Sequence, residues 1–186
     1  GEGLLASLHE GEGRLPDITE IMNGIRSLFE IPLPLKGKKV LVTAGPTRES
    51  IDPVRYISNR SSGKMGYALA EKVRDMGAEV VLVSGPVSLP PVPEVEMNYI
   101  ESAYEMERLV IQRSPVSDYI FMTAAVADYS PSEIAPEKMK RSDKNLKLNL
   151  KPSPDILKSI QDKTNSIIIA FALEIKNGEE EAKRKL

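Results

Sequence analysis

Short apolar runs recur along the chain and alternate with stretches of helical periodicity. The runs KVLVTAG (39–45), EVVLVSG (79–85), DYIFMTAAV (118–126) and SIIIAFAL (166–173) lack the polar alternation of a half-exposed strand. Such runs are typical of parallel strands that are buried on both faces of a sheet. Because helical segments separate them, the sequence predicts an α/β fold with three layers, in which a Rossmann-like, mostly parallel sheet carries helices on both faces.

The remaining segments are assigned from their periodicity and their terminal residues. Asp17 suits the start of one helix, and Gly77 suits the end of another. We predict helices over 17–30, 63–76, 102–113 and 153–163, a further helix from 178 onward, strands over 92–100 and 145–151, and a loop over the Gly-rich residues 1–16. Ligands bind at the carboxyl ends of the strands in such sheets, so functional residues are sought there.

The composition excludes several classes of function. The net charge is −2, so no nucleic-acid partner is predicted, and without cysteine there is no disulfide, thiolate metal site or thiol nucleophile. His9 is the single histidine, which excludes a multi-histidine metal site within one chain. No apolar run approaches the length of a membrane span and no signal-peptide pattern opens the chain, so we expect a cytoplasmic protein with no membrane partner.

Gly63-Lys64 suggests two nucleotide-binding motifs, and both are rejected. A phosphate-binding P-loop requires Gly, four residues, Gly, Lys and then Ser or Thr. Here Ser58 stands at the first glycine position and Met65 at the hydroxyl position. A dinucleotide fingerprint fails too, because neither a second glycine nor a helix closely follows the strand that ends at Gly45.

Residues 45–63, GPTRESIDPVRYISNRSSG, form a long insertion between the first strand and its helix. Long loops without secondary structure in compact domains are usually functional. This loop carries Asn59 and ends in Ser61, Ser62 and Gly63, where the free N–H groups of a helix N-terminus attract an anion. Two interpretations stay open here. One is a phosphate or carboxylate site, and the other is an ordinary N-cap at Ser61 or Ser62 beside the solvated side chains of Arg48, Arg55 and Arg60.

A second candidate site follows the strand predicted over 118–126. Thr123 and Ala124 are small enough for a ligand to approach closely, and Asp128 suits a hydrated magnesium ion or a ribose. A carboxylate followed by cations is what a metal–triphosphate needs, and the cations here are Lys138, Lys140 and Arg141. A solvated basic turn explains these residues equally well. The segments KPSPDI (151–156) and AFALE (170–174), taken alone, fit core and cap better than a ligand pocket.

Four stretches carry a family resemblance: VTAGPTRESIDPVRYISNRSSGKMGYALA (42–70), AAVADY (124–129), APEKMK (135–140) and PDIL (154–157). Together they resemble phosphopantothenoylcysteine synthetase, the ligase of coenzyme A biosynthesis. The first stretch is long and highly specific. The resemblance extends over residues 36–186 and implies a synthetase domain that lacks its C-terminal part.

The N-terminal stretch GLLASLHEGEGRLPDI (3–18) resembles the tail of the flavin-dependent phosphopantothenoylcysteine decarboxylase, which bacteria fuse ahead of the synthetase. The resemblance implies that residues 1–16 are this tail and that residues 17–35 are a connecting helix and linker. Ser7 stands where the decarboxylase usually has cysteine. Since the flavin domain is absent as well, we expect no decarboxylase activity of this chain and assign FMN to that absent domain alone.

The resemblance implies a reaction in two steps. The carboxylate of 4′-phosphopantothenate attacks the α-phosphate of CTP, which gives an acyl-cytidylate and pyrophosphate. The amine of cysteine then attacks the acyl carbon and releases CMP. The implied cofactor is Mg²⁺, and the implied partners are CTP, 4′-phosphopantothenate, cysteine and a second copy of the chain, with higher assembly through the decarboxylase domain.

The resemblance also implies roles for single residues. Lys138 matches an essential lysine that offsets charge on the triphosphate, Asn59 an asparagine needed to use the acyl-cytidylate, and Asp128 a residue near the metal. The other implied nucleotide-binding positions are Met122, Thr123, Ala124, Lys151, Pro152, Ser153, Pro154, Phe171 and Lys185. Candidates for the substrate phosphate or carboxylate are Arg55, Ser61, Ser62 and Gly63.

Two other functions stay open at this stage. A nicotinamide- or flavin-binding reductase fits the predicted fold, although the missing glycine fingerprint counts against it. A non-catalytic assembly piece fits a chain that lacks the family's C-terminal part, where the resemblance places another phosphate-binding lysine and much of the dimer contact. A screen of CTP, ATP and NADH separates these alternatives.

Overall fold

The structure is a computed structural model that describes residues 2–4, 10–12, 17–28, 33–141 and 145–172. The chain forms two compact units, Gly1–Leu33 and Pro34–Leu186. The first unit contains an antiparallel pair, β1 (Glu2–Leu4) and β2 (Glu10–Glu12), and the helix α1 (Ile18–Leu28). The predicted loop over 1–16 is therefore wrong at this antiparallel pair. The sequence gives no strand signal here, because Gly3 pairs with Gly11 and glycine is rare in strands.

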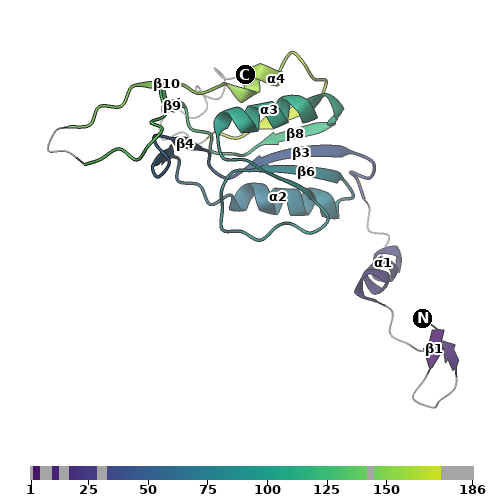
Figure 1. Ribbon diagram of the computed structural model, residues 1–186. Helices are drawn as coiled ribbons and strands as arrows, with labels where there is room; N and C mark the ends of the chain where they lie inside the picture. Colours follow the sequence, from purple (N-terminus) through teal and green to yellow (C-terminus); the bar gives the residue numbers. More distant parts are fainter. Residues whose placement is uncertain (1, 5–9, 13–16, 29–32, 142–144, 173–186) are drawn as a thin grey trace. The chain divides into compact units, whose positions relative to one another are not determined.

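The second unit is built on a five-stranded sheet with the order β11-β8-β3-β6-β7, in which every pair is parallel (Figure 1). The strands are β3 (Lys39–Ala44), β6 (Glu79–Ser84), β7 (Glu96–Tyr99), β8 (Tyr119–Met122) and β11 (Ile167–Ala170). The predicted α/β, Rossmann-like class with a mostly parallel sheet is confirmed.

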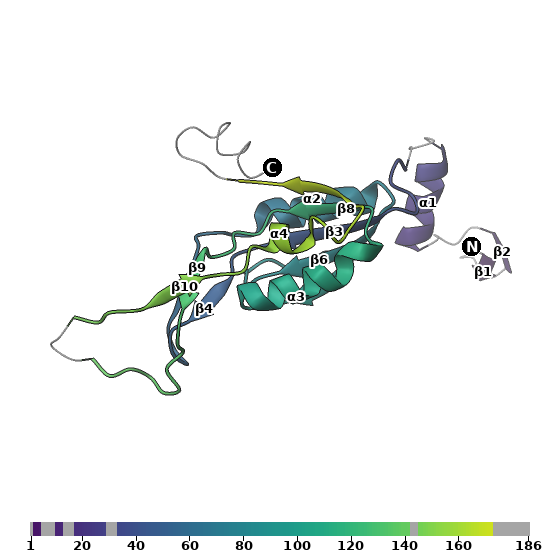
Figure 2. The same cartoon turned by 90° about the horizontal axis from the view of Figure 1, so that it is seen from above.

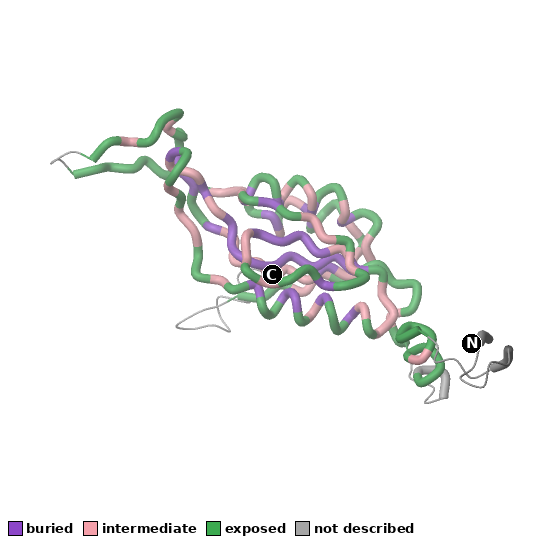
Figure 3. The backbone as a smooth tube through the Cα atoms, turned by 60° about the horizontal axis from the view of Figure 1, so that its bottom comes forward, coloured by how far each residue is buried: buried purple, intermediate pink, exposed green. Residues whose placement is uncertain are grey.

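Helices cover both faces of this sheet and give the three predicted layers (Figures 1 and 2). The helix α2 (Lys64–Asp75) lies on one face, while α3 (Ala103–Arg113), the 3₁₀ turn η1 (Ser114–Val116) and α4 (Ile156–Ile160) follow on the other. Alternate residues of β3 divide between the two cores, since Val40 and Val42 pack with α2 and Leu41 packs with α3 and α4. Figure 3 shows the central strands as the most buried part of the unit.

Several predicted elements are shorter in the structure than the sequence suggests. The helix predicted over 153–163 spans only Ile156–Ile160, because Asp155 is its N-cap and accepts a hydrogen bond from the Lys158 amide. The strand predicted over 145–151 is reduced to β10 (Leu150–Pro152), which pairs with β9 (Tyr129–Pro131). The helix predicted from 178 lies outside the described residues.

The insertion over 45–63 was predicted without secondary structure, and this is wrong. It contains the antiparallel pair β4 (Arg48–Ser50) and β5 (Tyr56–Ser58). Buried Glu49 accepts a hydrogen bond from the Ala103 amide at 3.0 Å, and the Arg48 amide donates to the carbonyl of Glu101 at 2.7 Å. These contacts reach more than fifty residues along the chain, so the local sequence pattern does not reveal them.

The connection pattern places a topological switch point of the sheet, which we call the β3–β8 crevice, beside β3. The chain runs from β3 through β6 to β7 on one side and then returns to β8 and β11 on the other. The strand order therefore reverses between β3 and β8, and ligands of open α/β sheets bind outside the carboxyl ends of such strands.

None of the helices in the described part of the chain combines the length and apolar character that a membrane span requires.

Gly66→Ala is expected to lower the free energy of unfolding by about 1–3 kcal/mol through overpacking. Gly66 brings the first turn of α2 against the ends of β3 and β8, and an added Cβ would lie 2.5 Å from Ala44 Cβ and 2.5 Å from Thr123 Oγ1. This clash outweighs the intrinsic helix propensity, which favours alanine over glycine by about 1 kcal/mol. Denaturant unfolding of the two proteins measures the difference.

Ala68→Gly is the matched control on the same helix, because Ala68 is exposed. Propensity alone should make this control less stable by about 1 kcal/mol. If Gly66→Ala were as stable as the parent protein, the close contact between α2 and the strand ends would be contradicted.

Candidate functional site

Two threonines lock the ends of β3 and β8 together. The Thr43 hydroxyl oxygen accepts hydrogen bonds from the amides of Thr123 and Ala124, each at 3.2 Å, and the Thr123 hydroxyl donates to the Thr43 carbonyl. The Ala125 amide donates to the Gly45 carbonyl at 2.8 Å. The amides of Thr123 and Ala124 are thus already bonded within the protein. Sequence reasoning missed Thr43, which reads as one more strand residue.

Asn59 joins the 45–63 insertion to the segment that follows β8. Its side-chain amide donates to the carbonyls of Ala125, at 3.3 Å, and Val126, at 2.9 Å. Buried Thr47 adds a second link, because its hydroxyl accepts from the Ala127 amide at 3.0 Å. The two candidate sites predicted from the sequence therefore lie side by side at the β3–β8 crevice.

The N-terminus of α2 is formed differently from the capped alternative considered above. The N-cap residue is Gly63, with φ of 73° and no side-chain cap, so an N-cap at Ser61 or Ser62 is wrong. The hydroxyl oxygens of Ser61 and Ser62 accept only long hydrogen bonds, of 3.4 and 3.5 Å, from the amides of Gly63 and Lys64. Glycine is needed at 63 because of its positive φ, and a Cβ there would lie 2.8 Å from Val87 Cγ1.

The N-terminus of α3 offers a contrast, because side chains close it. Ser102 and Glu105 form a capping box. Hydrogen bonds from the backbone amides of Glu101 and Ser102 lower the pKa of the Glu105 carboxyl below its ordinary value. Negative charge therefore already occupies this end of α3, whereas no side chain caps α2.

The three arginines of the insertion have different environments. Arg48 stacks on the Tyr56 ring, with its guanidinium carbon 4.6 Å from the ring centroid. Arg55 is half-buried and engaged with Asp52 and with the Met139 carbonyl. Arg60 is exposed and forms no hydrogen bond or ion pair with the residues that the structure describes. The role of Arg55 toward a substrate phosphate or carboxylate stays a prediction, as does that of the α2 N-terminus.

Asp52 is a buried charged residue beside the candidate site that sequence reasoning missed. Its side chain is fully buried, and its carboxylate accepts from the amides of Val54 and Arg55 at 2.9 Å, from the Arg55 guanidinium at 2.5 and 2.9 Å, and from the Met139 amide at 3.1 Å. Burial opposes its ionisation, but the guanidinium and the three amides outweigh burial and lower the pKa of Asp52 well below its ordinary value. The DPVR pattern, an Asp-Pro turn followed by arginine, is the signal that could have revealed it.

The turn over 151–154 lies beside Asp128, because β9 and β10 are paired. The Ser153 amide donates to the Asp128 carbonyl at 2.8 Å, and the Lys151 ammonium lies 5.6 Å from the centroid of the Tyr104 ring. The Ser153 hydroxyl is buried without a hydrogen-bond partner in the described part of the chain. At the neighbouring strand end, the Phe171 amide donates to the Met122 carbonyl at 3.1 Å, and 48% of Phe171 is exposed.

Lys138 belongs to an arm that extends from β9 and β10 beyond the sheet (Figure 2). Most of the described arm is exposed (Figure 3), including Lys138. Backbone contacts anchor it to the insertion, since the Ala135 amide donates to the Ile51 carbonyl at 2.9 Å. Lys138 itself makes no hydrogen bond or ion pair with other described residues, and Lys185 lies outside the described residues.

The arrangement suits a metal held jointly with a ligand better than a metal held by protein alone. The described residues contain no group of three His, Cys, Asp or Glu side chains that could hold a metal ion. Mg²⁺ is commonly bound by one or two carboxylates together with substrate phosphates, and exposed Asp128 could supply one carboxylate. The donor set therefore fits Mg²⁺ only in company with a phosphate ligand.

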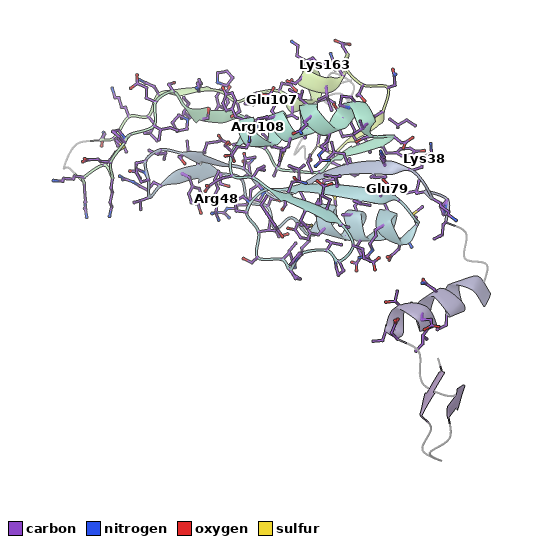
Figure 4. The ribbon with its side chains drawn as sticks, turned by 45° about the vertical axis from the view of Figure 1, so that its right-hand side comes forward. Lys38, Arg48, Glu79, Glu107, Arg108 and Lys163 are labelled. Atoms are coloured by element: carbon purple, nitrogen blue, oxygen red, sulfur yellow. The ribbon has the colours of Figure 1, made fainter. Side chains whose placement is uncertain are left out.

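The candidate site lies at the carboxyl edge of the sheet. A cavity of about 330 Å³ lies at the opposite edge, beside Lys39, Glu79, Glu96 and Arg113, and contains none of the predicted site residues. In Figure 4, Lys38 and Glu79 mark that amino edge, and Arg48 lies away from it on the side of the site. The topology of the sheet favours the carboxyl edge, because strand and helix termini converge there.

Comparison with known proteins places the chain among its relatives. A model of the DNA/pantothenate metabolism flavoprotein C-terminal domain matches residues 35–186. The coenzyme A biosynthesis bifunctional protein CoaBC of Bacillus subtilis (strain 168) is 44% identical over 189 residues, which cover 100% of this chain and 47% of that protein. A cysteine/cysteine sulfinic acid decarboxylase from an unidentified prokaryote is 40% identical over 196 residues, which cover 100% of this chain and 55% of that protein. The chain thus spans about half the length of these relatives.

A solved structure agrees with this comparison. The crystal structure of the C-terminal domain of the bifunctional protein CoaBC is similar with a TM-score of 0.72 and 46% identity, over 82% of this chain and 72% of that one. The family model, which matches residues 35–186, covers the whole sheet and the two motif segments, namely the 45–63 insertion and the segment over 123–141 that follows β8. The chain belongs to the family of DNA/pantothenate metabolism flavoprotein C-terminal domains.

Proposed function

We propose that the chain carries a CTP-dependent phosphopantothenate–cysteine ligase of coenzyme A biosynthesis. Residues 36–186 are the ligase domain in this proposal, residues 17–35 a connecting helix and linker, and residues 1–16 the tail of a decarboxylase domain. The name of the Bacillus subtilis relative, and its 44% identity across the whole of this chain, support a role in this pathway. A second copy of the chain as partner and a cytoplasmic location belong to the same proposal.

One observation carries this proposal, namely the junction of the two motif segments at the β3–β8 crevice. The Asn59 amide binds the carbonyls of Ala125 and Val126, and so connects the insertion to the segment that leads to Asp128. A ligation needs an acid substrate and a nucleotide held next to each other. The crevice is where an open α/β sheet binds ligands, and two segments of different chemistry border it there.

The nucleotide is proposed to lie along the ends of β8 and β11 and the turn over 151–154. The buried hydroxyl of Ser153 is a polar group that the described protein leaves unpaired, which suits a hydrogen bond to a base. Exposed Phe171 offers an apolar surface for the base or ribose, and Pro152 and Pro154 restrict the turn between them. Lys185 would add a phosphate contact from the C-terminal segment.

The first step joins the carboxylate oxygen of 4′-phosphopantothenate to the α-phosphorus of CTP, and the bond to pyrophosphate breaks. Both reactants are anions, so cations must lower their repulsion. Lys138 is a point charge suited to a phosphate that moves during reaction. Mg²⁺ would supply further charge neutralisation when Asp128 and the triphosphate hold it.

The second step joins the cysteine nitrogen to the acyl carbon, and CMP leaves while the amine loses a proton. Asn59 is suited to this step, because an amide orients a carbonyl or phosphate without adding a competing nucleophile. The hydrogen bonds from Asn59 to Ala125 and Val126 support this role, because they tie the insertion to the segment that follows β8.

We expect CTP with Mg²⁺ to raise the thermal unfolding temperature of the full-length protein more than ATP or NADH does, since a ligand stabilises the state it binds. Adding 4′-phosphopantothenate should then release pyrophosphate, and adding cysteine should release CMP. Protection by NADH alone would contradict the proposal and favour a reductase. Carbon dioxide released from cysteine or cysteine sulfinic acid without CTP would instead favour the activity named for the decarboxylase relative.

A further inference from the structure

We propose that Asp52 and Arg55 form a clamp that positions the Lys138 segment, which makes both of them positioning residues for the ligation. The inference rests on the proposed function, because that function gives Lys138 its task. It adds a device that holds Lys138 in place. Lys138 is exposed and its side chain makes no hydrogen bond or ion pair with the described residues, so its location depends on the backbone around it.

The clamp holds both backbone groups of Met139, the residue that follows Lys138. The Met139 amide donates to Asp52 Oδ2 at 3.1 Å, and the Met139 carbonyl accepts from Arg55 Nη2 at 2.6 Å. The same Arg55 nitrogen donates to Asp52 Oδ2 at 2.5 Å. Two charged side chains therefore bind the backbone amide and the backbone carbonyl of a single residue, at sequence separations of 87 and 84 residues.

The clamp is itself rigidly built. Asp52 Oδ1 accepts from the amides of Val54 and Arg55, which fixes the turn that carries both clamp residues. The Arg55 carbonyl accepts from the Ile51 amide at 2.8 Å, and the Ile51 carbonyl accepts from Ala135 at 2.9 Å. The 51–55 turn thus grips the arm at both Ala135 and Met139, which bracket Lys138.

A purely structural ion pair would not need this geometry. The Asp118–Lys38 pair at the amino edge, for example, joins neighbouring surface groups with both side chains partly exposed. Asp52, in contrast, is completely buried, and it and Arg55 take up the backbone of the segment that holds the proposed triphosphate lysine. Backbone contacts also leave the side chain of Lys138 free to follow a phosphate.

Asp52→Asn tests the clamp. Asparagine keeps the carbonyl oxygen that the Val54 and Arg55 amides need, but its NH₂ group faces the donors of Arg55 and Met139. We expect hydrogen exchange at the Met139 amide in the full-length protein to become about 10- to 100-fold faster, and kcat for CTP-dependent pyrophosphate release to fall by a similar factor. Trypsin should also cleave faster after Lys138.

Two further variants make the test specific. Asp118→Asn removes a carboxylate that accepts from the Lys39 amide and the Lys38 ammonium, and it should leave Met139 exchange and turnover unchanged. Arg55→Lys keeps the positive charge but loses the fork that binds Asp52 and Met139 together, and it should give an intermediate effect. If Asp52→Asn does not fold, Arg55→Lys tests whether the clamp holds Met139.

The Thr123 amide, which is bonded to Thr43, serves as the internal reference. Faster exchange at Met139 alone, together with the loss of kcat, supports the clamp. Equal acceleration at Met139 and Thr123 means general destabilisation and overturns it, as does normal turnover with a released Met139. Absence of CTP-dependent turnover in the parent protein contradicts the proposed function instead, and Met139 exchange then still decides whether the clamp holds the segment.

Discussion

Replacing Lys138 by glutamine is expected to lower the rate of CTP-dependent pyrophosphate release about 10²–10³-fold, the usual cost of losing one preorganised charge at a developing anion. Glutamine has a similar length and keeps hydrogen-bonding capacity, so the variant removes the charge without leaving a hole. Lys138 is exposed and its side chain makes no hydrogen bond or ion pair with the described residues, so the fold should not change. Single-turnover release of pyrophosphate from CTP and 4′-phosphopantothenate measures the effect.

Lys163→Gln is the matched control for this change. Lys163 is also exposed, but it precedes β11 and therefore lies at the amino edge of the sheet. It is labelled in Figure 4. Its variant should react at the parental rate and unfold at the parental temperature. Normal turnover by Lys138→Gln would remove Lys138 from the mechanism and leave the charge of the triphosphate to other groups.

The sheet was predictable because its signal is local. The runs over 39–45 and 79–85 coincide closely with β3 and β6, since strands buried on both faces need apolar side chains at every position. The strand and helix predicted over 145–151 and 153–163 were longer than the observed β10 and α4. Alternating polarity over 145–151 indicates a strand, but a strand forms only where it has a pairing partner. The partner β9 has three residues, so only Leu150–Pro152 pair with it as β10.

The sequence indicates the parts of the candidate site but not the contacts between them. The motifs identify Asn59 and Asp128, but the bonds from Asn59 to Ala125 and Val126 join residues that are 66 and 67 positions apart. Asp52 is harder still to identify, because the sequence alone does not distinguish a buried aspartate from a solvated one. Only its five hydrogen bonds, from two separate segments, distinguish it. The Gly63 cap was missed because serines are the stronger N-cap signal.

Asn59→Asp is expected to separate the two half-reactions. The nucleotide segment is held independently of Asn59, through Thr43 on the Thr123 and Ala124 amides, so the first step should stay close to the parental rate. An aspartate would set a negative oxygen against the carbonyls of Ala125 and Val126, which repels the insertion from the β8 segment. The second step should therefore slow about 10²–10³-fold, as for loss of a preorganised donor.

The expected signature is an acyl-cytidylate that accumulates in the presence of cysteine and can be separated after acid quenching. Asn98→Asp is the control, because the Asn98 side-chain amide donates a hydrogen bond to Glu96 on the same strand, β7. It makes the same chemical change without contact with the crevice, so no intermediate should accumulate. If Asn59→Asp gave no trapped cytidylate with or without cysteine, Asn59 would have no special part in the second step. Its tether between the two motif segments would then serve only to shape the crevice.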